Sequence, residues 1–269
     1  TLAKMIVGTE APTSGEILIN GTDYNKLKGK EKRAFRRNIQ MVFQDPLSSF
    51  SPRMKIGTYI CEPRVNYDGI KKEDAMKEAC ELLKLVGLPE EFIHRYPHEL
   101  SGGQLQRVAI ARAIAIDPYI LLCDEATGAL DVSIQNQIAK LLVRIVEEKD
   151  IGCIFIGHDL ALVRSVTQRI AVMYLGRVVE MINSDTLEEE CCHPYTKALL
   201  DSIFDVYCDQ NEEIKLIKGE PPSPLTVYEG CAFAGRCPYA TAKCHSQRPE
   251  LTWVSEGHLV ACHEYMNVK

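Results

Sequence analysis

Two acidic side chains and one histidine stand where runs of apolar residues end. Residues 119–123 are apolar without alternation and lead directly into Asp124 and Glu125, and residues 153–156 are followed by Gly157 and His158. Such runs predict strands buried on both faces, as in a parallel sheet. Because ligands of open α/β sheets bind at the carboxyl ends of strands, we expect the three side chains to meet at one sheet edge. Adjacent carboxylates there suit Mg²⁺ and could orient or deprotonate a water molecule; a strand end without a ligand is the alternative.

A glycine-rich segment opens a predicted helix. Ser101, Gly102, Gly103 and Gln104 precede a helical stretch that ends before Pro118. Serine is a suitable N-cap, and the two glycines let another group come close to the backbone. The free N–H groups and the helix dipole then favour an anion such as phosphate. Taken alone, the segment is equally compatible with a helix entry that binds no ligand.

Cysteine is over-represented near the end of the chain. There are 11 cysteines in total. Four of them are spaced C-x5-C-x6-C-x17-C: Cys231, Cys237, Cys244 and Cys262. Because no secretory signal is visible, a disulfide framework is not expected, whereas four thiolates can hold zinc or an iron–sulfur cluster. The short C-x2–4-C spacing typical of structural zinc is absent, so the spacing alone leaves metal and no metal open. We interpret Cys191, Cys192 and His193 as surface or core residues.

Composition narrows the classes of protein. Apolar residues make up 46% and charged residues 25%, which is ordinary for a globular protein, and the net charge is −6. This charge argues against a general basic surface for nucleic acid. The longest apolar run, residues 170–175, is far shorter than the roughly 20 residues of a membrane-spanning helix.

Hydrophobic periodicity predicts alternating strands and helices. We expect helices over residues 26–37, 73–86, 101–117 and 132–147, and strands over 16–20, 39–43, 119–124, 153–157 and 170–174. Residues 176–180 should pair with the last of these strands as a hairpin. This pattern indicates an α/β fold with a largely parallel sheet. The tail from residue 186 is rich in proline and cysteine and is interpreted as a separate extension.

In chain order, these motifs resemble those of ABC-type ATPases over residues 1–185. Gln44 matches the Q-loop, residues 100–104 the signature, 120–125 Walker B, 129–131 the D-loop and His158 the H-loop. The resemblance implies an ABC-type P-loop NTPase with a core (1–45 and 112–185), a helical signature subdomain (46–111) and a C-terminal extension (186–269).

The resemblance also implies an ATP-sandwich dimer in which each residue has a role. Asp124 would hold Mg²⁺ through water and Gln44 would sense it, while Glu125 would polarise the attacking water and His158 would contact the γ-phosphate. The signature and D-loop of one subunit would reach the nucleotide of the other. The residues implied there are Ser101, Gly102, Gly103, Gln104 and Asp131.

Two departures from the family pattern stand out. The P-loop motif G-x-x-x-x-G-K-[ST] is absent, and Thr1 and Leu2 match the residues that come immediately after its Gly-Lys-Ser. We therefore expect a fragment that begins just after the phosphate-binding lysine and serine, with Thr1 beside the nucleotide and Mg²⁺ site. By itself it should bind MgATP very weakly and hydrolyse none. Gly128 stands where the D-loop commonly has serine, which puts one contact across the dimer in doubt.

Several segments narrow the resemblance to the ATPases of oligopeptide, dipeptide and nickel importers. These segments are residues 42–46, 51–54, 131–135 and 193–199, while 218–224 resembles the F-type subunit more than the D-type. The resemblance implies ATP hydrolysis that powers peptide import. The implied partners are a second ATPase subunit in a heterodimer, two membrane permeases and an extracytoplasmic substrate-binding protein. The chain would lie on the cytoplasmic face of the inner membrane, with residues 45–60 near the permeases.

The cysteine-rich tail carries a resemblance of its own. Gly230-Cys231 and Arg236-Cys237-Pro238 match a tail motif of these importers, some members of which hold a [4Fe–4S] cluster. This favours a cluster over zinc at the four cysteines. Two other functions remain as alternatives. The first is a non-catalytic scaffold that lends its signature to a catalytic partner, and the intact Glu125 and His158 argue against it. The second is an ABC-type ATPase that acts on DNA, and the short stretch between Gln44 and the signature argues against it.

Overall fold

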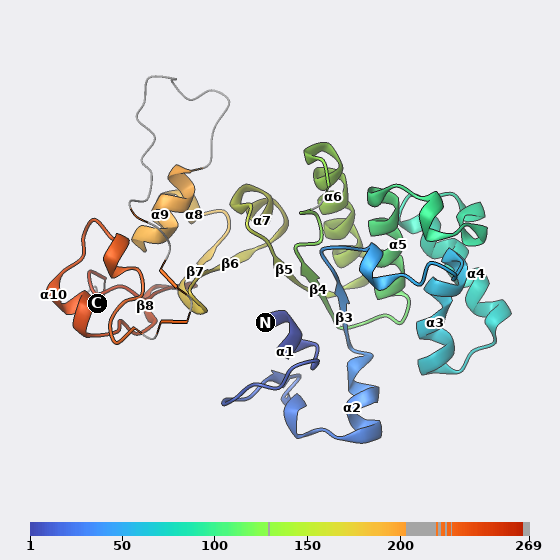
Figure 1. Ribbon diagram of the computed structural model, residues 1–269, viewed down its shortest axis with the longest axis horizontal. Helices are drawn as coiled ribbons and strands as arrows, with labels where there is room; N and C mark the ends of the chain where they lie inside the picture. Colours follow the sequence, from blue (N-terminus) through green and yellow to red (C-terminus); the bar gives the residue numbers. More distant parts are fainter. Residues whose placement is uncertain (129, 203–218, 220–221, 224, 227, 266–269) are drawn as a thin grey trace. The chain divides into compact units, whose positions relative to one another are not determined.

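The computed structural model describes residues 1–269 apart from 129, 203–218, 220–221, 224, 227 and 266–269. The chain forms two compact units, Thr1–His158 and Asp159–Lys269, which Figure 1 shows with their helices and strands. None of the helices in the described ranges is both long and apolar enough to cross a membrane. Each unit is described by itself.

A parallel sheet with the strand order β3-β4-β5 forms the centre of the first unit. The strands are β3 (Ile39–Val42), β4 (Ile120–Asp124) and β5 (Gly152–Ile156). Leu121, Leu122 and Cys123 of β4 are fully buried, which confirms the prediction of a central strand. The same prediction was wrong for β5, where Cys153 and Ile154 are exposed. The reason is that β5 pairs only with β4 among the described strands, so it lies at the edge of the sheet.

Helices pack beside this sheet. They are α3 (Ile56–Asp68), α4 (Lys72–Leu85), α5 (Gly102–Ile114) and α6 (Val132–Lys149), of which α4, α5 and α6 confirm the predicted periodic stretches. Short 3-10 turns lie between them at Leu47–Ser49, Glu90–His94 and Pro97–Glu99. The buried face of α6 presents Ile138, Leu142 and Ile145 to a core shared with α3, α4, α5 and the sheet. Burial of such a face is the main source of helix stability in a protein.

Helix α3 was not predicted, because Pro63 lies inside it. Proline lacks an N–H group, so the carbonyl of Tyr59 has no partner four residues later. Arg112 of α5 fills this place by donating from its guanidinium to the Tyr59 carbonyl oxygen. The same guanidinium lies 4.3 Å from the centre of the Tyr59 ring and forms an ion pair with Glu62. A side chain from a neighbouring helix thus compensates for the missing backbone bond.

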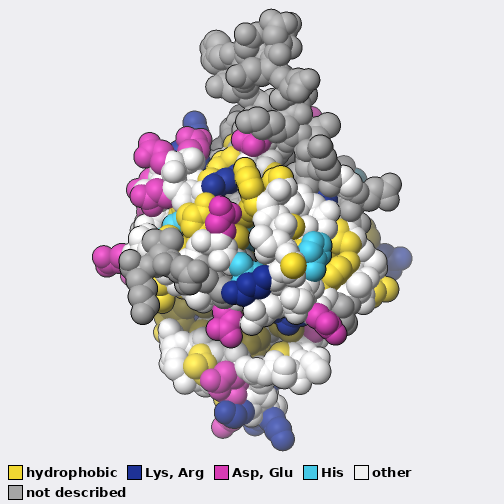
Figure 2. Space-filling view, turned by 90° about the vertical axis from the view of Figure 1, so that its left-hand side faces the viewer, with side chains coloured by type: hydrophobic (Ala, Val, Ile, Leu, Met, Phe, Trp, Pro, Cys, Tyr) yellow, Lys and Arg dark blue, Asp and Glu magenta, His cyan; other side chains and the backbone are white. Residues whose placement is uncertain are grey.

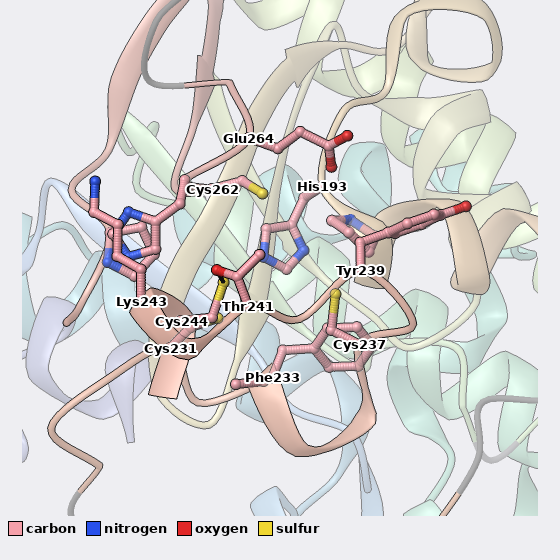
Figure 3. Close-up of a pocket in the computed structure, with 14 residues that line it drawn as sticks. His193, Cys231, Phe233, Cys237, Tyr239, Thr241, Lys243, Cys244, Cys262 and Glu264 are labelled. Carbon is pink, nitrogen blue, oxygen red and sulfur yellow. Dashed lines mark hydrogen bonds between the residues drawn. The ribbon is translucent and has the colours of Figure 1, made fainter. Parts of the chain in front are cut away.

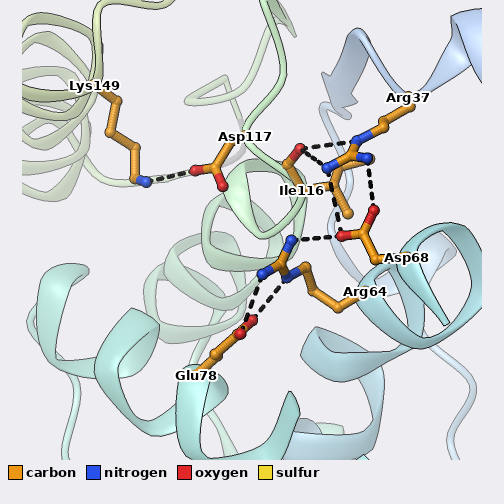
Figure 4. A network of polar contacts seen from close by, with 7 residues as sticks. All are labelled: Arg37, Arg64, Asp68, Glu78, Ile116, Asp117 and Lys149. Carbon is orange, nitrogen blue, oxygen red and sulfur yellow. Dashed lines mark hydrogen bonds and ion pairs between the residues drawn. The ribbon is translucent and has the colours of Figure 1, made fainter. Parts of the chain in front are cut away.

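An ion-pair network joins the helical segment to the start of the sheet (Figure 4). Arg64 pairs with Asp68 on its own helix and with Glu78 on α4, and Arg37 pairs with the same Asp68 at 2.6 Å. Arg37 also donates to the carbonyl oxygen of Ile116. The hydrogen bonds to Glu78 raise the pKa of Arg64, so its charge is fixed.

The N-terminal part of the first unit contains short elements. They are α1 (Leu2–Ile6), β1 (Leu18–Ile19), β2 (Thr22–Asp23), a 3-10 turn at Tyr24–Lys26 and α2 (Gly29–Arg36). The expected strand around residue 18 pairs with β2 as a tight hairpin. The charged helix predicted over 26–37 is confirmed in its second part by α2.

The second unit contains an antiparallel sheet with the strand order β6-β7-β9-β8. Its strands are β6 (Arg169–Tyr174), β7 (Arg177–Asn183), β8 (Thr252–Ser255) and β9 (His258–Val260). The predicted hairpin of β6 and β7 is confirmed. Buried and exposed residues alternate along β6, so only one of its faces is buried. Only one face of β6, with Ile170, Val172 and Tyr174, packs on the apolar cluster of this unit.

This second sheet joins strands from both sides of residue 185, because β7 pairs with β9. The predicted division into residues 1–185 and 186–269 therefore differs from the division into compact units, and it stays a prediction about functional regions. The helical elements are α7 (Leu160–Val166), α8 (Leu187–Glu190), α9 (Pro194–Asp201), a 3-10 turn at Ala234–Arg236 and α10 (Ala242–Ser246). On the face shown in Figure 2, basic side chains lie among acidic, histidine and hydrophobic ones.

Candidate functional site

Three of the predicted site residues meet at the carboxyl edge of the parallel sheet. Gln44 follows β3, Glu125 follows β4 and His158 follows β5. The Gln44 side chain donates from Nε2 to Oε2 of Glu125 at 2.6 Å. Nδ1 of His158 lies 3.9 Å from the same oxygen. The His158 side chain is 74% exposed and that of Glu125 is 35% exposed, so both remain accessible to a ligand.

The backbone around Glu125 turns sharply to hold its carboxylate in this position. Glu125 has a positive φ of 47°, in the left-handed region that non-glycine residues seldom adopt. Its N–H group donates to the carbonyl oxygen of Ile156 at 2.9 Å, which ties the turn to β5. A Cβ atom at Gly128 would lie 3.6 Å from the Glu125 carboxylate and 3.7 Å from Gln44 Nε2. This is ordinary contact distance, so a Cβ atom fits at this position without displacing its neighbours.

The glycine-rich helix entry has the geometry that its sequence predicts. Ser101 Oγ accepts from the N–H of Gln104, and Gln104 Oε1 accepts from the N–H of Ser101, which closes a capping box. A Cβ atom at Gly103 would lie only 2.8 Å from Cγ2 of Ile134 on α6. Glycine is thus required at position 103 for the close approach of α5 and α6.

The remaining predicted residues of this region lie on the expected elements but make fewer contacts. Asp124 is the half-buried last residue of β4, and Asp131 is the exposed residue that precedes α6. Thr1 is exposed and precedes α1, and its side chain does not cap that helix. A carboxylate at a strand end beside a second one that is held by an amide can bind a hydrated cation and orient water.

The four predicted metal-binding cysteines line one cavity in the second unit. The cavity has a volume of about 390 Å³ (Figure 3). Cys231 precedes the 3-10 turn, Cys237 follows it, Cys244 lies on α10 and Cys262 follows β9. Phe233, which is almost fully buried, and His193 also line the cavity. The structure thus gathers four cysteines, of which consecutive ones are separated by 5, 6 and 17 residues in sequence.

For three of the four cysteines of this cavity, the surroundings favour the neutral thiol. Burial raises the pKa of Cys231, Cys237 and Cys262, and neighbouring thiols add to this effect. For Cys244, the hydroxyl of Thr241 lies 3.3 Å from the sulfur. A bound cation would reverse the effect, because metal coordination favours the thiolate.

A buried carboxylate beside this cavity was missed by sequence reasoning. Glu180 of β7 is 0% exposed and accepts from the backbone N–H groups of Cys192, at 2.6 Å, and His193, at 3.1 Å. Nε2 of His258, also buried, donates to Glu180 at 2.8 Å. Ligand atoms of Glu180, Cys192 and His258 all lie within 4.8 Å of one another. A single glutamate in an ordinary strand gives no sequence signal for such a role.

Comparison with known proteins connects both regions to one family. The ABC transporter family matches residues 1–128, and the oligopeptide/dipeptide transporter C-terminal region matches residues 179–244. The di/tripeptide transport ATP-binding protein DppF of Pseudomonas aeruginosa is 43% identical over 263 residues, which are 98% of this chain and 81% of that protein. The oligopeptide transport ATP-binding protein OppF of Haemophilus influenzae is 43% identical over 97% of this chain and 80% of its own length.

Solved structures show the same fold. The dimeric ATP-binding cassette MJ0796, in a post-hydrolysis state bound to ADP and Pi, has a TM-score of 0.61 and 33% identity, covering 68% of this chain and 79% of its own. The protein cbiO1 from Clostridium perfringens, part of the ABC transporter complex cbiONQ, has a TM-score of 0.62 and 30% identity, covering 68% and 72%. With relatives that align over almost its whole length, the chain belongs to the ABC transporter ATP-binding proteins, in the branch that carries the oligopeptide/dipeptide transporter C-terminal region.

Proposed function

We propose that this chain belongs to the ATP-hydrolysing subunit of an ABC transporter that imports peptides, with hydrolysis expected of a subunit whose P-loop is complete. The observation that carries the proposal is the meeting of Gln44, Glu125 and His158 at one sheet edge, where the Glu125 carboxylate is held at 2.6 Å by the Gln44 amide. Relatives named as peptide transport ATP-binding proteins over nearly the full chain support the substrate class.

Each residue has a task that its position allows. Glu125 orients the attacking water and accepts its proton, because its carboxylate is fixed by an amide donor yet partly open to solvent. Asp124, at the end of β4, binds Mg²⁺ through water, and the exposed His158 donates to the γ-phosphate. When MgATP is bound, the metal neutralises charge on the phosphates. Gly102 and Gly103 approach the nucleotide of the opposite subunit with N–H groups at the start of α5, with Ser101 and Asp131 beside them.

The partners follow from this assignment. The protein pairs with a second ATPase subunit in a heterodimer and acts as its F-type member. Two membrane permeases and an extracytoplasmic substrate-binding protein complete the transporter. The protein lies on the cytoplasmic face of the inner membrane, where residues 45–60, around the 3-10 turn at Leu47–Ser49, contact the permeases. The exposed Leu47 is the apolar residue of that turn that such a contact would cover.

Peptide uptake tests the proposal. Transporter assembled with this subunit in vesicles should take up labelled di- and oligopeptides only when MgATP and the substrate-binding protein are present. The matched control is the same assembly with the ATPase subunit omitted. Nickel uptake in place of peptide uptake would overturn the substrate class, and peptide uptake that does not need MgATP would overturn the function.

We further propose that Cys231, Cys237, Cys244 and Cys262 hold one metal centre, with a [4Fe–4S] cluster favoured over zinc. The support is their common cavity. The four cysteines also lack the C-x2–4-C spacing that is typical of structural zinc. Bound there, an iron–sulfur cluster would supply electron transfer or a rigid cross-link.

Metal analysis distinguishes these possibilities. Protein purified without oxygen should contain iron and acid-labile sulfide, and a variant with Cys237→Ala should lose both. Cys153→Ala is the matched control, because Cys153 is exposed on β5 and lies in the other unit. Stoichiometric zinc without iron would replace the cluster by a zinc site, and protein free of any metal after growth with sufficient iron would remove the proposal.

A further inference from the structure

His193 lines the four-cysteine cavity although sequence analysis gave it no role. Its ring is almost fully buried, with the residue 1% exposed, and it lies 5.9 Å from the Phe233 ring, centre to centre. In Figure 3 the imidazole points among the sulfur atoms of the cavity, whereas the Glu264 carboxylate points away from them. A polar ring in such a position needs a hydrogen-bond partner.

The protonation state of the ring follows from its hydrogen bonds. His193 caps α9, and its Nδ1 accepts from the backbone N–H of Tyr195 at 3.1 Å. A ring nitrogen that accepts carries no proton, so the proton of the neutral imidazole is on Nε2. Within the described residues, Nε2 makes no hydrogen bond. The imidazole therefore brings an unpartnered N–H group to a cavity whose walls carry four thiols.

Hydrogen bonds of the neighbouring backbone fix the position of this N–H group. The backbone N–H groups of Cys192 and His193 both donate to the fully buried carboxylate of Glu180, which also binds His258 of β9. The ring is held in turn by the Tyr195 N–H and by Phe233. Such support of a residue near a metal centre normally serves to orient it.

We propose that His193 is a positioning residue of the cysteine centre, whose Nε2–H donates a hydrogen bond to a sulfur atom in the cavity. The inference rests on the proposed metal centre at the four cysteines. Hydrogen bonds to the sulfur atoms stabilise their negative charge, which strengthens metal binding and sets the reduction potential of a cluster. His193 thereby connects the centre to the Glu180 anchor on β7.

Cobalt(II) binding to the metal-free full chain tests the role of His193 directly. Thiolate-to-cobalt charge-transfer absorption reports the sulfur environment, and competition with a chelator gives the dissociation constant. We expect His193→Phe to weaken cobalt binding by about 10–100-fold, the usual effect of removing a partner that supports the ligands, and to shift the charge-transfer bands. His193→Gln, which keeps a side-chain N–H donor, should recover most of the affinity.

The control variant is Thr196→Val. Thr196 lies on α9, like the residues that follow His193, and its buried hydroxyl makes no hydrogen bond within the described residues. This variant should leave cobalt affinity and the absorption bands unchanged, and thermal unfolding of the metal-free variants shows whether each is folded. Equal affinity and identical bands for wild type and His193→Phe would overturn the role of His193 alone. Absence of thiolate–cobalt absorption in the wild type, together with absence of iron and acid-labile sulfide in protein purified without oxygen, would overturn the metal centre as well.

Discussion

Replacing Glu180 by alanine should strongly destabilise the second unit. The carboxylate is 0% exposed and accepts from three donors, the backbone N–H groups of Cys192 and His193 and the Nε2–H of His258. Glu180→Ala leaves all three donors buried without a partner. Each such group costs about 1–3 kcal/mol. Because the site can relax, we expect a total loss of about 3–5 kcal/mol, as for a broken buried ion pair.

For a unit of this size the loss lowers the midpoint of thermal unfolding by more than about 10 °C. Trp253 of β8 is the sole tryptophan of the chain, so its fluorescence reports on this unit. Glu180→Gln should fall between wild type and Glu180→Ala, since one amide oxygen still accepts. The control Glu189→Ala removes an exposed glutamate of α8 and should unfold like the wild type. If Glu180→Ala unfolds within about 0.5 kcal/mol of the wild type, the range expected for a neutral surface change, the anchoring role is refuted.

Three further predictions test other parts of the structure. Gly103→Ala should destabilise the first unit by about 1–3 kcal/mol, because the new Cβ lies 2.8 Å from Ile134. Adding Ile134→Ala should recover part of this loss, as measured by chemical denaturation. Arg64→Met should lower the free energy of unfolding by about 1–2 kcal/mol, because it breaks the pairs with Asp68 and Glu78. If Arg64→Met costs the same in a Glu78→Ala background as in the wild type, the network is contradicted. Burial lowers the pKa of His193 to about 4, so between about pH 4 and 6.5 the unfolded chain binds a proton that the folded chain does not. Stability of the second unit should therefore rise with pH in this window, and His193→Phe should lack that part of the slope in pH-dependent unfolding.

The elements that sequence analysis predicted well are those with strong periodicity. The apolar run before Asp124 and the amphipathic pattern of α6 each have one structural solution, and both are found. Helix α3 was missed because its sequence contains Pro63, and only a long-range contact from Arg112 makes the helix complete. The edge position of β5 also depends on which strands pair with it, and pairing is not encoded within the strand itself.

Some residues of the candidate sites could be predicted from the sequence, and others could not. Motif order placed Gln44, Glu125 and His158 at strand ends, and parallel strands necessarily bring their ends to one edge. The cavity of four cysteines could be expected from their number and clustering. The roles of Glu180 and His193 could not be predicted from the sequence, because they arise from the pairing of β7 with β9 and from a helix cap close to the cavity. A lone glutamate and a lone histidine carry no spacing pattern.

The measurement that tests the central claim most directly is ATP hydrolysis by a transporter whose ATPase subunit has a complete P-loop and carries Glu125→Gln. The amide preserves an oxygen that can accept from Gln44, so nucleotide binding should persist while the base is lost. Turnover should fall by about 10²–10⁴-fold, or roughly 3–5 kcal/mol in the barrier, and Glu147→Gln on the exposed face of α6 should have no effect. Wild-type turnover by Glu125→Gln would contradict the assignment of Glu125, and with it the proposed mechanism of ATP-driven import.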